Sequence, residues 1–172
     1  DEARRRVLAH VTRLGAEPVA VAEALGRVLA EDVVSAEAVP GFDNSAMDGY
    51  AVRAADTEGG TATLDVVDES RAGHPAGRAV GHGEAIAIST GAMVPDGADA
   101  VVRVEDTDGG RETVAVTTAV EPGRDIRRAG EDIGAGETVL TAGTEIGPAE
   151  AGVAADRTPN SARYVAANTA GR

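Results

Sequence analysis

The sequence contains no cysteine and no lysine, and it has very few aromatic residues. Without cysteine the chain forms no disulfide, holds no thiolate-bound zinc and has no cysteine nucleophile. The aromatic residues are Phe42, Tyr50 and Tyr164, so the hydrophobic core must be built from Val, Ala, Leu and Ile. The three histidines are scattered and form no HxxxH or HExxH pattern, which argues against a histidine-based metal site.

Positive charge is also scarce. All 16 basic residues are arginine and they stand against 29 acidic residues, which gives a formal net charge of −13. Nucleic acid and anionic membranes both require a basic face, so we expect neither as a partner. A surface this acidic repels itself, and at roughly 1 M salt the screening length of about 3 Å would remove most of that repulsion. A source with a salty cytoplasm would explain the charge, and so would high-GC coding with replacement of Lys by Arg.

Long hydrophobic runs are missing as well. No apolar run approaches the ~18 residues that span a bilayer, and no signal peptide opens the sequence, so we expect a cytoplasmic protein. The first residue is not Met, which suggests a trimmed or partial chain. At 172 residues the chain can form one domain or two small ones, and its 22 glycines favour short strands joined by tight turns.

Hydrophobic spacing predicts helices and short strands in the first 35 residues. Apolar residues recur on one stripe of Glu2–Leu14, which predicts a helix, and Gly15 is a natural stop. Pro18–Val21 looks like a short strand, Ala22–Ala30 like a second short helix, and Asp32–Ser35 like a returning strand.

The pattern changes to β from about residue 50. Apolar and polar residues alternate in Ala62–Val67 and more clearly in Glu84–Ser89. Ala100–Glu105 and Thr113–Thr117 flank a turn at residues 106–110, which predicts a hairpin. The acidic residues of this turn fit a calcium loop poorly, because its glycine stands in the wrong place for an EF-hand. We interpret them as turn residues.

Helical character returns near the end of the sequence. Short strands are expected around Val139–Leu140 and Glu145–Ile146, and Pro148–Ala155 reads as a helix with proline at its start. The tail, residues 156–172, has weak periodicity and is expected to be an edge strand or a frayed end.

The order of these elements is helical, then β, then helical again. It predicts an α+β fold in which a β-rich, barrel-like domain is inserted into a mixed domain of helices and strands. The inserted domain is expected at residues 47–132, and the mixed domain at residues 1–46 and 133–172.

Three polar clusters could carry chemistry, and the first is the segment Asp43–Tyr50, which reads DNSAMDGY. If its carboxylates, Asp43 and Asp48, converge to about 4 Å, they repel by about 4 kcal/mol at an effective dielectric of 20. Such a pair requires a cation or an arginine, and Mg²⁺ suits carboxylate and hydroxyl oxygens. Composition alone favours a capped structural turn.

The other two clusters are Ser89–Gly91, at the end of the clearest strand, and Ile126–Ile133, which reads IRRAGEDI. Hydroxyl groups and backbone N–H groups of the first could hold an oxyanion, although strand-end Ser and Thr more often form simple turns. The arginines of the second could hold a phosphate, or could pair with the neighbouring acids on the surface. Taken alone, each cluster is better explained as ordinary surface structure.

The three clusters occur together and in order, and the segments that contain them closely resemble the N-terminal half of molybdopterin molybdenumtransferase, the MoeA/gephyrin E-domain family. The resemblance runs from about residue 1 to residue 155. It is carried by the segments Gly26–Val33, Val39–Arg53, Ser89–Val102 and Ile126–Ile133.

The resemblance implies an activity and an architecture. This family inserts molybdenum from molybdate into adenylylated molybdopterin with Mg²⁺ and releases AMP. Its subunits are elongated homodimers with a mixed dimerisation domain at the N-terminus, a β-rich domain inserted in it, and a pterin-binding domain later in the sequence. The active cleft lies between subunits, so the loops described above would reach the pterin-binding domain of a partner subunit.

The resemblance also implies site residues. The catalytic positions fall on Asp48, Thr90 and Asp132, and the substrate-binding positions on Ser45 and Arg127. Asp48 is the expected Mg²⁺ ligand. In our interpretation Asp48 and Asp132 orient the metal or a water near the phosphate, Thr90 bonds an oxyanion, and Arg127 offsets its charge.

The sequence departs from the family after Ala155, where residues 156–160 interrupt the pattern, and no Gly-rich phosphate-binding unit follows. This chain would therefore hold at most half of a shared active site and would be inactive alone. Two readings remain open. The chain is either the front half of a molybdenum-inserting enzyme or a non-catalytic dimerisation and assembly module that retains the family scaffold.

Overall fold

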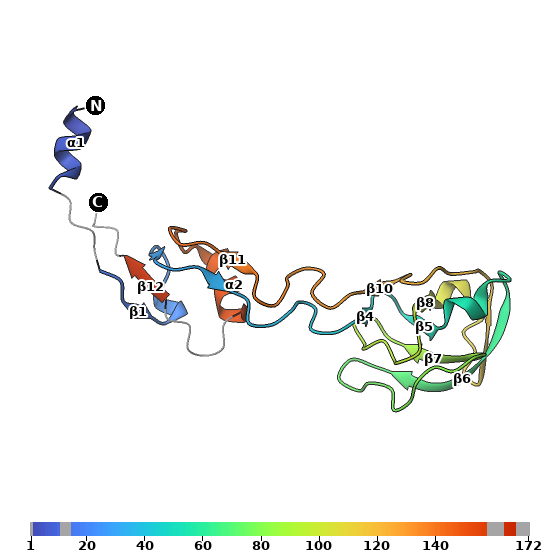
Figure 1. Ribbon diagram of the computed structural model, residues 1–172. Helices are drawn as coiled ribbons and strands as arrows, with labels where there is room; N and C mark the ends of the chain where they lie inside the picture. Colours follow the sequence, from blue (N-terminus) through green and yellow to red (C-terminus); the bar gives the residue numbers. More distant parts are fainter. Residues whose placement is uncertain (1, 11–14, 158–163, 168–172) are drawn as a thin grey trace. The chain divides into compact units, whose positions relative to one another are not determined.

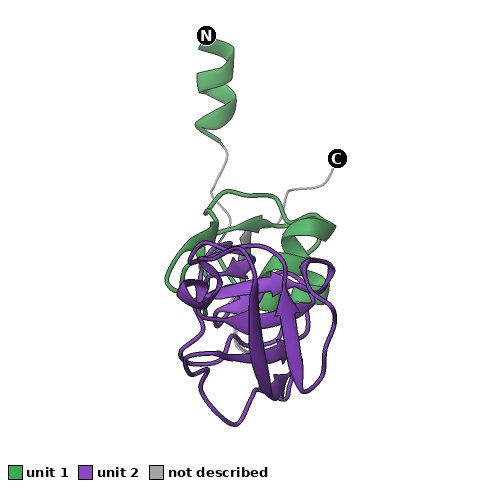
Figure 2. Ribbon diagram, turned by 90° about the vertical axis from the view of Figure 1, so that its right-hand side faces the viewer, with its two compact units in different colours: residues 1–37, 133–172 green, residues 38–132 purple. Residues whose placement is uncertain are grey.

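A computed structural model of the chain describes residues 2–10, 15–157 and 164–167. The chain divides into two compact units, which we call unit 1 (residues 1–37 and 133–172) and unit 2 (residues 38–132) (Figure 2). The fold is α+β, with few helices and a curled sheet in unit 2, as the sequence predicts. No helix among the described residues is long and apolar enough to cross a membrane.

Unit 1 consists of short strands and helices (Figure 1). Its elements are α1 (Glu2–Leu8), β1 (Pro18–Val19), the 3₁₀ helix η1 (Val21–Glu23), β2 (Val28–Leu29), β3 (Val33–Val34), β11 (Thr138–Leu140), α2 (Pro148–Arg157) and β12 (Tyr164–Ala167). One sheet has the order β1-β12-β2, and β11 pairs with β3 in another. A small aliphatic core joins them, formed by Ala24, Leu29, Val33, Ile146 and Ala154.

Several expectations for unit 1 are confirmed and others are wrong. The strand at residues 32–35 and the helix that begins at Pro148 are present as β3 and α2. The helix expected at residues 22–30 is not formed, because Gly26 has a left-handed φ of 76° and ends the helical turn. The strand β2 follows it instead.

Both ends of unit 1 differ from the expectation. The first helix ends at Leu8 and not at Leu14, and residues 11–14 lie outside the described residues. The tail contributes β12, which pairs with β1 on one side and β2 on the other, so it is a central strand and not an edge strand. The remaining positions of the predicted tail, residues 158–163 and 168–172, are outside the described residues.

Unit 2 is built on a five-stranded sheet with the order β8-β5-β7-β6-β9 (Figure 1). These strands are β5 (Gly49–Val52), β6 (Ala62–Ser70), β7 (Glu84–Ile88), β8 (Ala100–Arg103) and β9 (Thr113–Val116). The 3₁₀ helices η2 (Ala54–Thr57) and η3 (Val104–Asp106) and the two-residue strands β4 (Asn44–Ser45) and β10 (Ile126–Arg127) complete the unit. Strands β6 and β7 run parallel, and the other neighbours in the sheet are antiparallel.

The prediction of a hairpin between residues 100–105 and 113–117 is wrong. Strands β8 and β9 form at these positions, but they lie on opposite edges of the sheet. The sheet curls into a half-barrel, and an isolated bridge pairs Thr107, which follows β8 and η3, with Val116 of β9. The acidic residues between the strands act as turn residues, as expected, since Asp108 accepts hydrogen bonds from the backbone N–H groups of Gly110 and Ala115.

Apolar residues on both faces of the sheet form the core of unit 2. Tyr50 and Val52 of β5 pack with Leu64, Val102 and Val114 in one cluster. Ala51, between them in sequence, belongs to a second cluster with Ile88, Ala92 and Val101. The alternation along β5 therefore buries both faces of this strand, which fixes the position of the loop that precedes it.

Candidate functional site

Asp48 and Thr90 are in direct contact, although they are 42 residues apart in sequence. Asp48 precedes β5 and Thr90 follows β7, and the pairing of Gly49 with Ile88 brings the ends of these two strands together. The Asp48 Oδ1 atom accepts hydrogen bonds from the Thr90 backbone N–H at 2.7 Å and from the Thr90 hydroxyl at 2.8 Å. The structure thus joins the first and second polar clusters at the surface of unit 2.

The bonds to Thr90 stabilise the charged form of Asp48. The Thr90 backbone N–H, and after it the Thr90 hydroxyl, lower the pKa of Asp48 below its ordinary value. Both side chains are exposed, so the carboxylate is an anion that solvent and a ligand can reach. Gly91 follows Thr90 with a left-handed φ of 79°, which lets the chain turn sharply at this point.

Strand β4 connects this contact to the third polar cluster. On one side, the Ser45 backbone N–H donates to Ala92 O at 3.0 Å, and the Gly91 N–H donates to Ser45 O at 2.8 Å. On the other side, β4 pairs antiparallel with β10, which places Ser45 opposite Ile126. Strand β4 therefore lies between the Thr90 turn and the arginine-containing segment.

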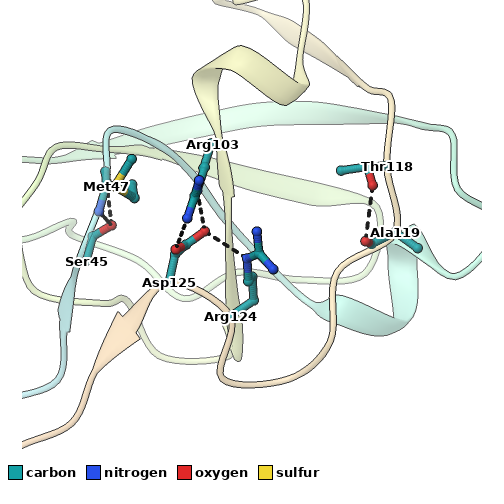
Figure 3. A network of polar contacts seen from close by, with 7 residues as sticks. All are labelled: Ser45, Met47, Arg103, Thr118, Ala119, Arg124 and Asp125. Atoms are coloured by element: carbon teal, nitrogen blue, oxygen red, sulfur yellow. Dashed lines mark hydrogen bonds and ion pairs between the residues drawn. The ribbon is translucent and has the colours of Figure 1, made fainter.

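The Ser45 side chain has little access to solvent. Only 1% of Ser45 is exposed, and its hydroxyl donates to Met47 O and accepts from the Met47 N–H (Figure 3). These bonds are typical of a serine that shapes a turn. The structure thus engages the Ser45 hydroxyl within the loop that carries Asp48, and substrate binding by Ser45 stays a prediction.

Arg127 and Asp132 form an ion pair with each other. The Arg127 Nη2 atom donates to Asp132 Oδ2, and roughly half of each side chain is exposed, 44% and 49%. Arg127 lies opposite Asn44 in the pairing of β10 with β4. The five predicted site residues therefore form two contacting pairs, Asp48 with Thr90 and Arg127 with Asp132, with the buried Ser45 in the strand between them.

Asp43 makes contacts that the sequence does not reveal. Its Oδ1 atom accepts the Ala129 backbone N–H at 2.8 Å, and its Oδ2 atom accepts Arg128 Nη1 at 2.5 Å. The Ala129 N–H and then the Arg128 side chain lower the pKa of Asp43. Asp43 and Asp48, which were considered as a converging pair of carboxylates, thus have separate partners: an arginine in one case and a threonine in the other.

Asp125 is a second residue that sequence reasoning missed (Figure 3). Its carboxylate forms two hydrogen bonds with Arg103, at 2.8 and 2.9 Å, and one with Arg124 at 3.1 Å. Its carbonyl accepts the Ala46 N–H at 2.8 Å, which holds the loop before Asp48. One feature of the sequence could have indicated this role: a single acid stands between two arginines, in the order Arg124, Asp125, Ile126, Arg127.

The residues around Asp48 fit Mg²⁺ only partially. Within the described part of the chain, no group of three or more acidic or histidine side chains is arranged to hold a metal ion. Both Thr90 bonds are accepted by Oδ1 of Asp48, which leaves Oδ2 as the atom that a cation would use. Since Mg²⁺ commonly retains waters and takes phosphate oxygens from a substrate, one carboxylate is sufficient for such a site but does not define it.

Comparison with known proteins assigns these elements to a described region. A family model described as "MoeA N-terminal region (domain I and II)" matches residues 1–157. Molybdopterin molybdenumtransferase 2 of Mycobacterium tuberculosis is 48% identical over 157 residues, which are 88% of this chain and 38% of that protein. The molybdopterin molybdenumtransferase of Haemophilus influenzae is 39% identical over 150 residues, 86% of this chain and 37% of that protein.

Solved structures agree with the sequence relatives. One crystal structure of the molybdopterin biosynthesis moeA protein from Pyrococcus horikoshii OT3 superposes with a TM-score of 0.76 at 40% identity, covering 83% of this chain and 38% of that one. A second structure of the moeA protein from this organism gives a TM-score of 0.80 at 34% identity, covering 91% and 41%. The chain therefore spans little more than a third of the length of these relatives and corresponds to their N-terminal region.

Proposed function

Because this chain belongs to the MoeA N-terminal region family, we propose that it is the front part of an enzyme that inserts molybdenum from molybdate into adenylylated molybdopterin and releases AMP. The observation that carries the proposal is the contact between Asp48 and Thr90. Exposed residues of two polar clusters that are distant in sequence meet there, and strand β4 links this contact to the arginine-containing segment. An ordinary surface turn does not require this convergence.

The proposed roles follow from the chemistry of each side chain. Asp48, kept ionised by Thr90, orients a water or a cation near the phosphate that is lost as AMP. The Thr90 hydroxyl and the Arg127 guanidinium offset the negative charge of phosphate or molybdate oxygens. Asp132 holds Arg127 until the anion replaces it, and Ser45 shapes the loop that carries Asp48. Bound Mg²⁺ would supply further charge compensation at the phosphate oxygens.

A pterin-binding domain is required in addition to this chain. We propose that it comes from a partner subunit of a homodimer or from a C-terminal half, and that the assembly works in the cytoplasm. The chain alone is expected to be inactive, because nothing in its described residues resembles a Gly-rich phosphate-binding unit for the pterin diphosphate.

Complementation tests the proposal. We would mix the chain with a separately expressed pterin-binding half and measure AMP release that depends on molybdate. Asp48→Asn should lower the rate by about 100-fold or more, the lower end of what a positioned general acid or base contributes. Asp65→Asn, at an exposed position of β6, is the matched control and should retain the rate.

Two results would contradict the proposal. If Asp48→Asn unfolds the chain, Asp48 is a residue of a capped structural turn. If the wild-type chain supports no AMP release but still forms a complex with the pterin-binding half, the chain is a non-catalytic assembly module.

A further inference from the structure

Asp43, in the first polar cluster, bonds both the third cluster and the segment that follows the second. Its carboxylate contacts the arginine-containing segment, and its carbonyl accepts the Val94 N–H at 3.0 Å, in the segment that follows the Thr90 turn. Asp43 itself belongs to the cluster that includes Asp48. One half-buried aspartate therefore connects three segments that are far apart in sequence, and the proposed catalytic roles do not use it.

The tip of the segment that Asp43 holds is a tight turn, in which the Arg128 N–H donates to Glu131 Oε2 at 2.9 Å and the Glu131 N–H donates to Arg128 O at 3.0 Å. Strand β10 contains only two residues, and isolated pairings of this size are weak. The end of the segment is held by the Gly130 N–H, which donates to Pro40 O at 2.9 Å, and by the Asp132 N–H, which donates to Val39 O at 2.9 Å. Just before these two attachments, the Ala129 N–H is bonded to Asp43.

Asp43 also separates the two adjacent arginines. Arg127 and Arg128 carry equal charges and both could pair with Asp132 or with an anion. The Asp43 carboxylate binds Arg128, while Arg127 pairs with Asp132. This arrangement leaves Arg127 as the guanidinium that can exchange Asp132 for a ligand anion without competition from its neighbour.

We propose that Asp43 is a positioning residue: by holding Arg128 and the Ala129 N–H, it fixes the segment so that Arg127 receives the oxyanion, molybdate or phosphate, at the site. The consequence for catalysis rests on the function proposed above. The positioning itself is a property of this chain and can be measured without turnover.

The first experiment measures backbone amide hydrogen exchange on the chain alone. Asp43→Ala should accelerate exchange of the Ala129 amide by about tenfold, because the amide loses its acceptor. Asp68→Ala is the matched control, since Asp68 also accepts two backbone N–H groups, from Glu69 and Gly77, in another part of unit 2. That variant should leave the Ala129 amide unchanged. Unchanged Ala129 exchange in folded Asp43→Ala would overturn the proposal.

The second experiment uses the complementation assay and separates binding from turnover. Asp43→Ala should raise about tenfold the KM for molybdate if Arg127 receives molybdate, or the KM for adenylylated molybdopterin if it receives the phosphate, with kcat within about twofold, because a misplaced Arg127 weakens anion binding in ground and transition states alike. Asp68→Ala should change neither constant. The charge-reversed pair D43R/R128D should bring the KM part of the way back toward the wild-type value. Equal KM changes in Asp43→Ala and Asp68→Ala would overturn the proposal.

A milder variant addresses folding. If Asp43→Ala does not fold, Asp43→Asn removes the charge that holds Arg128 with little change of shape, and the same KM increase is expected on a smaller scale. If the wild-type chain shows no turnover at all, the proposed function fails, while the exchange comparison still decides whether Asp43 holds the segment.

Discussion

At the level of single residues, the bonds from Thr90 lower the pKa of Asp48. Thr90 contributes two donors to the same oxygen, Oδ1 of Asp48. The backbone donor depends on the fold, but the hydroxyl depends on the side chain alone. The contribution of the hydroxyl can therefore be isolated by a substitution that preserves side-chain shape.

Thr90→Val should raise the pKa of Asp48 toward its ordinary value, because the hydroxyl donor is lost while the backbone donor remains. Thr90→Ser retains the hydroxyl and should leave the pKa near that of the wild type. Carboxyl-detected NMR titration of Asp48 measures both. A pKa that is identical in Val and Ser variants would show that the hydroxyl has no influence on Asp48.

The sequence identifies single residues better than it identifies their partners. Asp48, Thr90, Arg127 and Asp132 could be named because they lie in motifs that resemble a family. The bond between Asp48 and Thr90 depends on the pairing of β5 with β7, which local sequence does not encode. The same is true of Asp43 and Arg128, which are 85 residues apart.

At the level of elements, a buried acid holds the turn before β10 to the end of β8. Asp125 has a left-handed φ of 51° and only 11% of its side chain is exposed. The hydrogen bonds from Arg103, and after them that from Arg124, lower the pKa of Asp125. Because its carbonyl also holds the Ala46 N–H, this turn supports the loop that carries Asp48.

Asp125→Asn should lower the free energy of unfolding by about 1–2 kcal/mol, less than the full value of charged hydrogen bonds because Arg103 is partly exposed. Asparagine tolerates the left-handed conformation, so this variant isolates the lost charge. Asp125→Ala should cost about 1 kcal/mol more, since alanine does not tolerate that conformation. Urea denaturation measures both, and equal losses would contradict the conformational part of the prediction.

The decrease in the free energy of unfolding caused by Asp125→Asn should depend on pH. The folded-state pKa of Asp125 lies below its value in the unfolded chain, about 3.9. Its stabilising effect is therefore fully present above that unfolded-state value and disappears as the pH falls through the folded-state pKa. The difference in the free energy of unfolding between wild type and variant should be smaller when urea denaturation is repeated at pH 3 in place of pH 6.

Strand positions could be predicted from alternation, but strand pairing could not. The alternating segments at residues 62–67 and 84–89 are strands β6 and β7, as expected. The predicted hairpin failed because β8 pairs with β5, while the segment after β8 takes the place beside β9: the Asp108 N–H donates to Ala115 O, and the Thr117 N–H donates to Asp106 O. The helix expected at residues 22–30 failed because a single left-handed glycine outweighs the helical spacing around it.

At the level of the whole molecule, each compact unit has a hydrophobic core of its own. Unit 2 contains two apolar clusters, and unit 1 contains one. The sequence anticipates an inserted β-rich domain from the order of the elements. The compact unit begins at Ala38, before the boundary expected at residue 46, and the domain boundaries remain a prediction that requires a folding experiment.

A chain of residues 38–132 alone should fold. It includes both apolar clusters and the five-stranded sheet, so it retains the interactions that stabilise unit 2. Its amide NMR spectrum should be dispersed and should overlay the corresponding signals of the full chain. A collapsed spectrum would show that unit 2 requires unit 1 for stability.

The two ends of unit 2 are bonded to each other, because the Asp132 N–H donates to Val39 O and the Gly130 N–H donates to Pro40 O. To the remainder of the polypeptide, the whole insertion is thus a loop with joined ends, and lengthening such a loop costs little because its closure entropy grows slowly with length. Relatives could lengthen, shorten or exchange the interior of this segment without disturbing the host fold, provided that the hydrogen bonds between its two ends are kept.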